Sequence, residues 1–164
     1  SGDATYDGAV YQCVDYKYWL WHLGLKAGTC QAPHGAVDGA SVGIEICNYG
    51  ALTKQADGTF LHYLNKPVPQ DQVVDLGFEW RGYQYWHAYT DAQLATLKEF
   101  IPQLSATLGF SLEKGKVWTV DDFKFDPNGY MQKPLAFHVS YRTDKVDLNP
   151  QPKLIAMLNE IHAA

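Results

Sequence analysis

Basic residues are scarce in this sequence, and they form no long run of lysine or arginine. The 13 Lys and Arg residues are outnumbered by 18 Asp and Glu residues, which gives a formal net charge of −5 at pH 7. Proteins that bind the phosphates of nucleic acids need a broad basic surface. We therefore expect no nucleic acid among the partners of this chain.

Long apolar runs are also missing. No stretch approaches the roughly 18 consecutive apolar residues of a membrane span, so no membrane span is expected. The segment Ser1 to Tyr6 has neither the basic nor the apolar region of a signal peptide. The chain as given is expected to be soluble and without a signal peptide.

Cysteine is the third scarcity. The sequence has 3 cysteines, Cys13, Cys30 and Cys47, and no C-x-x-C pair. An odd, small number argues against a disulfide framework, and the missing pair argues against a metal knuckle or a redox motif. We expect these residues to be mostly buried thiols.

What the sequence does contain is typical of one globular domain. Its 164 residues, 46% hydrophobic and 14% aromatic, suffice for a core that needs no disulfide or metal as its main support. Short β-rich runs at residues 9–14, 42–47 and 135–139 predict strands. Residues 57–85 carry turn signals of a hairpin-like insertion rather than of a second core, and residues 126–129 read as a turn.

Two helices are predicted from their ends. Thr90 and Gln93 form a capping box, and apolar residues at helical spacing follow until Gly109. A final helix is expected with Asn149 as its N-cap and Pro150 in its first position. Strands together with helices predict an α/β domain with its site at strand ends and in loops.

The strongest group of candidate site residues is His138 followed by Arg142, Lys145 and Asp147. Imidazole nitrogen and carboxylate oxygen are both zinc ligands, and a strand end with the loop after it can bring them to one ion. Lys145 would place a cation where an oxyanion develops. The alternative is a hydrogen-bonded core histidine followed by a solvated loop.

Glu45 is the second candidate, because it is the one carboxylate in an otherwise apolar run. Burial of such a group is costly without a partner, and burial would favour its use as a general base. The alternative is an ion pair with a nearby Arg or Lys. A third candidate is the aromatic cluster of Trp21 and His22 with Tyr16, Tyr18 and Trp19, which suits stacking on a sugar or, alternatively, belongs to the core.

Taken together, these segments resemble the zinc-dependent N-acetylmuramoyl-L-alanine amidases of type 2, a family that includes phage endolysins and peptidoglycan-recycling amidases. The matching segments occur in the family's order and span nearly the whole chain. They are residues 6–12, 21–24, 41–45 and 89–93, and His138 with Lys145-x-Asp147.

The resemblance implies an α/β fold with a central mixed β-sheet flanked by helices, and a shallow zinc groove that binds peptidoglycan. It implies His138 and Asp147 as zinc ligands, Glu45 acting on the attacking water, and Lys145 supporting the tetrahedral intermediate. The bond cut would join N-acetylmuramic acid to L-alanine. The protein would act on the bacterial cell wall. It would be either phage-encoded and released at lysis, or cytoplasmic.

The same resemblance implies substrate contacts from His22, from Trp21 on the rim of the groove, and from Asn48. The family's first zinc ligand is a His before the Asp-Gly turn, and this sequence has no His before His22. We therefore expect residues 1–164 to form a single amidase-like domain that lacks the family's N-terminal strand and binds zinc weakly. If zinc is held tightly, His22 and His34 are the candidate third ligands.

Two classes of function follow from the resemblance. The first is a peptidoglycan amidase. The second is a catalytically silent peptidoglycan-binding module, or a fragment of a longer amidase. Release of L-alanine amino termini from cell walls, as opposed to co-sedimentation with them, separates the two.

Overall fold

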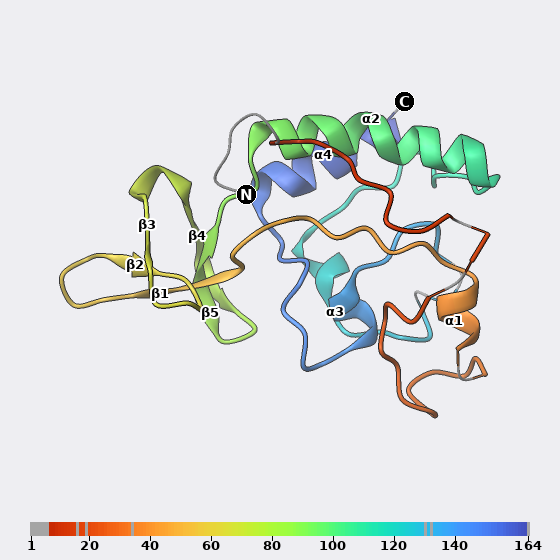
Figure 1. Ribbon diagram of the computed structural model, residues 1–164, viewed down its shortest axis with the longest axis horizontal. Helices are drawn as coiled ribbons and strands as arrows, with labels where there is room; N and C mark the ends of the chain where they lie inside the picture. The colour runs from red at the N-terminus through yellow and green to blue at the C-terminus, as the bar shows by residue number, and fades with distance from the viewer. Residues whose placement is uncertain are drawn as a thin grey trace.

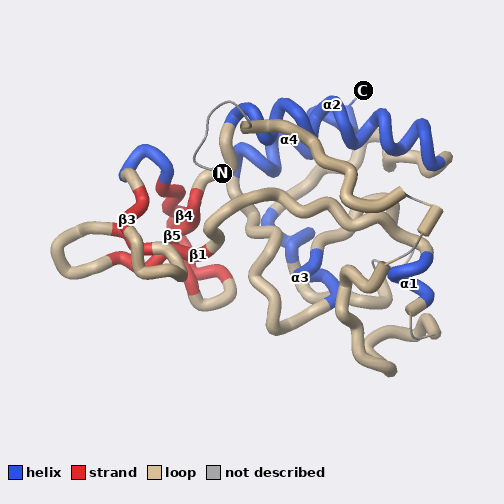
Figure 2. Tube along the Cα trace, viewed as in Figure 1, coloured by secondary structure: helices blue, strands red, loops and turns tan. Residues whose placement is uncertain are grey.

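A five-stranded sheet lies at one end of the molecule and the α-helices lie at the other (Figures 1 and 2). The structure, a computed structural model, describes residues 7–15, 17–18, 20–33, 35–129, 131 and 133–163. The sheet has the order β3-β2-β1-β5-β4, and the described pairings are all antiparallel. Its strands are β1 (Ala51–Lys54), β2 (Phe60–Leu61), β3 (Pro67–Val68), β4 (Val73–Trp80) and β5 (Tyr83–His87).

Two long helices, α2 (Asp91–Leu108) and α4 (Pro152–Ala163), pack against each other along the top of the view in Figure 1. The remaining helices are short: α1 (Ala36–Gly39), η2 (Gln70–Gln72), η3 (Val120–Phe123) and α3 (His138–Tyr141). The combination of sheet and helices in one chain confirms the predicted α/β class.

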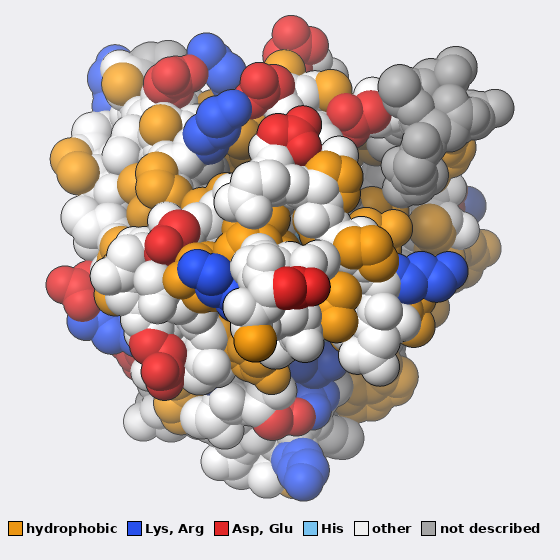
Figure 3. Space-filling model, turned by 90° about the vertical axis from the view of Figure 1, so that its left-hand side faces the viewer, with side chains coloured by type: hydrophobic (Ala, Val, Ile, Leu, Met, Phe, Trp, Pro, Cys, Tyr) orange, Lys and Arg blue, Asp and Glu red, His pale blue; other side chains and the backbone are white. Residues whose placement is uncertain are grey.

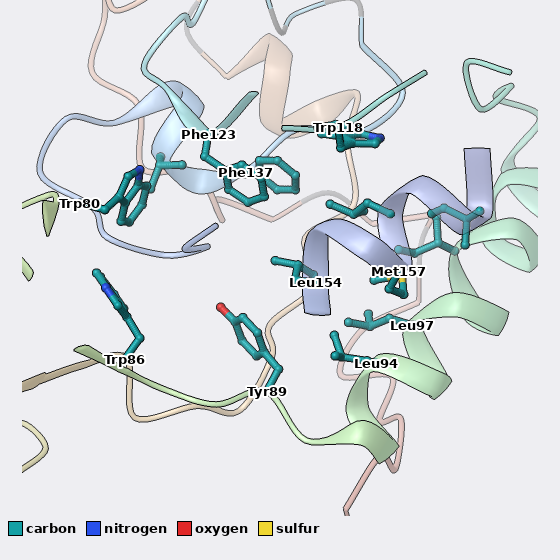
Figure 4. Close-up of a cluster of buried hydrophobic side chains, with 14 residues drawn as sticks. Trp80, Trp86, Tyr89, Leu94, Leu97, Trp118, Phe123, Phe137, Leu154 and Met157 are labelled. Carbon is teal, nitrogen blue, oxygen red and sulfur yellow. The ribbon is translucent and has the colours of Figure 1, made fainter. Parts of the chain in front are cut away.

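The main core joins the sheet to these helices through large aromatic side chains (Figure 4). Trp86 of β5 is completely buried, and the rings of Phe123 and Phe137 stack with their centroids 4.3 Å apart. Phe137 and Val139 both belong to this core. Because they flank His138, the core fixes the backbone from which that histidine projects.

The hairpins of residues 57–85 are present, but they carry a small core of their own. Leu52, Phe60 and Val68 from β1, β2 and β3 are buried against one another. The expectation that this region has no separate core is therefore wrong. Three antiparallel strands with one apolar face supply enough contact to bury these side chains.

The helix predicted from Thr90 is confirmed at both ends. Thr90 Oγ1 accepts a hydrogen bond from the Gln93 amide at 3.0 Å, and Gln93 Oε1 accepts one from the Thr90 amide at 3.1 Å. Gly109 ends the helix with φ of 76°, a left-handed conformation that glycine adopts without strain.

The start predicted for the last helix is wrong, because α4 begins at Pro152 instead of Pro150. Asn149 is buried, and its amide donates to the Tyr89 hydroxyl at 3.2 Å instead of capping a helix. Both prolines fit the first turn of a helix, so the local signal did not choose between them.

The three predicted strands are also wrong. Residues 9–14 and 42–47 are irregular, and His138 and Val139 begin α3 instead of ending a strand. The buried-thiol expectation fails in the same segments, since Cys13 and Cys47 are exposed and Cys30 is half-buried. Apolar runs indicate a strand only where another strand pairs with them, and pairing is not a local property.

Within the described residues, no helix has the length and apolar character to cross a membrane. The face at the sheet end carries acidic and basic side chains scattered among apolar ones (Figure 3). This mixed surface agrees with the low net charge of the chain.

Candidate active site

His138, the first residue of α3, lies directly against Asp147 in the loop that follows the helix. His138 Nδ1 is 2.9 Å from Asp147 Oδ2, and His138 Nε2 is 3.1 Å from the carbonyl oxygen of Leu23. The Val139 amide donates to the Asp147 carbonyl at 3.0 Å, which closes the loop. A carbonyl oxygen only accepts and a carboxylate accepts when ionised, so both ring nitrogens donate.

This contact polarises both partners. The hydrogen bond with Asp147 raises the pKa of His138, while partial burial and the nearby Lys145 charge act in the opposite direction. The same hydrogen bond lowers the pKa of Asp147. The His138 side chain is 17% exposed and that of Asp147 is 55% exposed. The pair is thus an imidazolium and a carboxylate at the edge of solvent.

Lys145 is half-buried beside this pair. Its charge lowers the pKa of both His138 and Asp147. None of the ion pairs between described residues involves Lys145. The structure therefore places His138 against Asp147, with the charge of Lys145 acting on both, and the roles predicted for the three residues stay predictions.

Arg142, which ends α3, serves the structure of the loop. Its guanidinium donates to both carboxylate oxygens of Asp144, at 2.9 and 2.5 Å, and to the Gly24 carbonyl at 3.2 Å. The hydrogen bonds from Arg142 lower the pKa of Asp144 to about 2. Leu23 and Gly24 thus both contact the segment that carries His138.

Glu45 lies in the irregular segment between α1 and β1, where its side chain is exposed. The burial expected for this carboxylate is absent because no strand forms there. The ion pairs between described residues do not include Glu45 either, so the alternative of a paired carboxylate gains no support. Its role as a general base stays a prediction.

His22 is held by its ring. Nδ1 lies 2.9 Å from the Leu20 carbonyl, and Nε2 lies 3.0 Å from Ser41 Oγ. The Ser41 hydroxyl donates to the Val37 carbonyl at 2.6 Å, so its oxygen accepts from the ring. The ring also lies over Gly43, where a Cβ would come within 3.1 Å of His22 Cδ2. The side chain is 22% exposed, which leaves a small face for a substrate contact.

Trp21 is exposed, and its indole ring packs against Gly35. Tyr18 is exposed as well, so these two rings are not core residues. Tyr16, Trp19 and His34 lie outside the described residues. Exposure of Trp21 is compatible with stacking on a sugar, which stays a prediction.

The side-chain amide of Asn48 forms hydrogen bonds with backbone groups. Its Nδ2 donates to the carbonyls of His87 and Ala88, both at 3.1 Å, and its Oδ1 accepts from the Gly50 amide at 2.8 Å. These bonds join the segment before β1 to the end of β5. The predicted substrate contact of Asn48 is untested, and its structural role was not foreseen.

Arg81, in the turn between β4 and β5, contacts the candidate site but was not predicted from the sequence. Its guanidinium donates to the carbonyls of Val139 at 3.0 Å and Thr143 at 2.7 Å, at the end of α3. The backbone of Arg81 has φ of 52°, as a tight turn before Gly82 requires. The turn could be predicted from Arg81-Gly82. The contact of Arg81 with Val139, 58 residues away, could not.

Asp38 in α1, whose carboxylate is fully buried, was not predicted from the sequence either. Its Oδ1 accepts from the amides of His22 and Leu23, each at 2.9 Å. Nothing in the Gly-rich segment around Asp38 singles out this residue.

An α/β chain in which an imidazolium, a carboxylate and a lysine converge on a solvent-facing loop has the groups of a hydrolase site. A family model of N-acetylmuramoyl-L-alanine amidases matches residues 4–129. The chain belongs to this amidase family, whose members are hydrolases that act on peptidoglycan. The match covers Glu45 and His22 and ends before His138. Searches of curated proteins and of solved structures gave no match.

The family is generally zinc-dependent, so the residues present were compared with a zinc site. His138 and Asp147 have suitable donor atoms, but both ring nitrogens of His138 are engaged. In the described part of the chain, no group of three or more His, Cys, Asp or Glu residues is placed to hold a metal. Catalytic zinc ordinarily has three protein ligands. The described residues therefore do not form a complete zinc centre.

Proposed function

We propose that this amidase hydrolyses the bond between the lactyl group of N-acetylmuramic acid and L-alanine, as a single catalytic domain acting on the bacterial cell wall. The observation that carries this proposal is the contact of 2.9 Å between His138 and Asp147, with the Lys145 charge beside it. Family membership supports peptidoglycan amidase activity in general. The particular bond is the finer part of the proposal.

In the proposed reaction, water attacks the amide carbonyl and the carboxylate of Glu45 takes the proton that the water loses. A new carbon–oxygen bond forms, and the carbonyl oxygen becomes an oxyanion. Lys145 stabilises that oxyanion with its ammonium group. The carbon–nitrogen bond then breaks, and Glu45 returns the proton to the amine of L-alanine. The exposure of Glu45 makes it accessible to water and substrate.

Substrate recognition is assigned to Trp21, His22 and Asn48. The exposed indole of Trp21 offers an apolar face to the sugar ring. His22 presents the edge of a ring whose orientation is fixed by Leu20 and Ser41. Asn48 would need to exchange a backbone partner for the substrate, so its contribution is expected to be the smallest.

Zinc is a separate part of the proposal, and no step above depends on it. We propose His138 and Asp147 as its ligands in this chain, on the chemistry of their donor atoms. His138 must release a proton to bind a metal, because both of its nitrogens donate in the structure. Two ligands predict weak binding.

The incomplete ligand set favours one competing function, a peptidoglycan-binding module without catalysis. Purified cell walls are incubated with the protein, and newly exposed amino termini are labelled and identified. An amidase produces L-alanine termini, and Glu45→Gln abolishes them while Glu79→Gln, another exposed carboxylate, does not. Co-sedimentation with walls without new termini would establish the binding module instead.

A further inference from the structure

Asp38 is a buried carboxylate that has no role in the proposed reaction. Its side chain has no exposed surface. Oδ1 accepts two backbone amides, and Oδ2 has no hydrogen-bond partner among the described residues. A buried polar atom without a hydrogen-bond partner destabilises the folded state. Such a residue needs an explanation.

The two amides belong to the loop that contacts the candidate active site. The amides of His22 and Leu23 point to Asp38, each at 2.9 Å. The carbonyl of Leu23 lies 3.1 Å from His138 Nε2, and the carbonyl of Gly24 accepts from Arg142 at 3.2 Å. The loop is therefore held on one side by Asp38 and holds His138 on its other side.

The ring of His22 is a further contact between Asp38 and the same loop. Its Nδ1 lies 3.7 Å from Asp38 Oδ1. The ring is held in place by the Leu20 carbonyl and the Ser41 hydroxyl, at 2.9 and 3.0 Å. Asp38 thus contacts two consecutive residues, His22 and Leu23, and these contacts fix the conformation of the loop.

We propose that Asp38 is a positioning residue for His138 and acts through the backbone of Leu23. The proposal rests on the proposed function only in assigning His138 to the active site. With Asp38 present, the Leu23 N–H is fixed, and this holds the carbonyl of Leu23, in the next peptide group, where it accepts from His138 Nε2. The ring of His138 then has one orientation, in which Nδ1 faces Asp147. Without the acceptor at position 38, the Leu23 carbonyl loses its support and the ring can turn.

The test compares Asp38→Asn with Asp38→Ala. Asparagine retains one oxygen to accept the amides of His22 and Leu23, whereas alanine retains none. On cell walls we expect Asp38→Asn to keep kcat within about threefold of the unaltered protein. Asp38→Ala should lose kcat by about tenfold or more, because His138 bonds Asp147 beside Lys145, and small misplacements in an active site have effects up to about 100-fold. KM should change little in Asp38→Asn. Asp57→Ala is the matched control, because Asp57 also accepts a backbone amide, from Thr59 at 2.9 Å, in an exposed turn.

Ring nitrogen NMR of metal-free protein with labelled histidine supplies an arm that needs no activity. The signals of His138, assigned with His138→Gln, should be unchanged in Asp38→Asn and shifted in Asp38→Ala. Those of His62, whose Nδ1 accepts from Leu64, should stay in place in both. Unchanged His138 signals in a folded Asp38→Ala would overturn the proposal. So would equal losses of kcat in the two variants with both folded.

If Asp38→Ala does not fold, hydrogen exchange of backbone amides in the unaltered protein tests the contact between Asp38 and Leu23 instead. The Leu23 amide should exchange slowly, and fast exchange would contradict its bond to Asp38. A protein that fails to hydrolyse walls at all would refute the proposed function. The ring signals and the exchange rate would still decide whether Asp38 positions His138.

Discussion

His138 donates in two directions at once, to Asp147 Oδ2 at 2.9 Å and to the Leu23 carbonyl at 3.1 Å. A ring held in this way carries a proton on each nitrogen and has no lone pair to offer. The hydrogen bond with Asp147 also raises the pKa of His138. Any metal that binds here therefore competes with a proton, and the competition is measurable.

Zinc uptake by this chain should be weak and should rise with pH. Binding at His138 releases a proton, so below the raised pKa the apparent affinity increases by up to about tenfold for each pH unit. Zinc retained after dialysis at pH 6 and at pH 8 measures this dependence. His138→Gln should abolish the difference. Stoichiometric zinc at both pH values would show that another residue, His22 or His34 first, completes the site.

Replacement of Glu45 by glutamine should reduce amide hydrolysis by about 100-fold or more, the usual contribution of a general base. The free energy of unfolding should change by less than about 0.5 kcal/mol, because the side chain is exposed. Rates on cell walls and urea unfolding measure the two quantities. Activity equal to that of Glu79→Gln would remove Glu45 from the reaction.

Arg81→Ala should lower the free energy of unfolding by roughly 1–3 kcal/mol, because the carbonyl groups at the end of α3 lose the hydrogen bonds that the guanidinium donates. Arg81 donates to Val139 and Thr143, which lie on either side of the turn after His138. Urea unfolding gives the stability, and the wall assay gives the accompanying loss of rate. Lys124→Ala removes an exposed ion pair with Asp121 and should cost under about 0.5 kcal/mol. Equal effects of the two variants would show that Arg81 does not secure α3.

Protonation of His87 should lower the free energy of unfolding in mild acid. Burial lowers the pKa of His87, and the charge of His62 lowers it further. A lowered pKa in the folded state means that the unfolded chain binds the proton more readily below about pH 6.5. The stability is therefore present above that pH and is lost as the pH falls through it.

His87→Asn removes this titration, so urea unfolding at pH 7.5 and at pH 5.5 should show a smaller loss in the variant than in the unaltered protein. The Tyr49 amide, which faces His87 Nδ1 at 3.4 Å, loses its acceptor when the ring is protonated. Identical losses in the two proteins would assign the acid sensitivity elsewhere.

Local signals were sufficient where an element is stabilised by its own residues. The helix α2 was predicted at both ends because Thr90, Gln93 and Gly109 satisfy its terminal backbone groups directly. The strands at 9–14 and 42–47 were wrong because a strand depends on its partner, and apolar composition does not supply one. The sheet instead forms between residues 51 and 87, where turns bring neighbouring segments together.

The candidate site was predictable in part for the same reason. His138 begins α3 and Asp147 lies in the loop after that helix, 9 residues further on, so their contact requires only a short closure. The contacts of Asp38 with Leu23 and of Arg81 with Val139 join separate segments, and they depend on the folded core. Chemistry-bearing residues can be found from their type and spacing, but residues that orient them were visible only in the structure.

The most direct test of the account uses a defined fragment, N-acetylmuramic acid linked to a stem peptide through L-alanine. The fragment is incubated with the protein, with and without added zinc, and the products are identified by mass spectrometry. The account predicts free N-acetylmuramic acid and an intact peptide with L-alanine at its amino terminus, both lost with Glu45→Gln. A fragment that stays whole under both conditions, or that breaks within the peptide or the sugar, would contradict it.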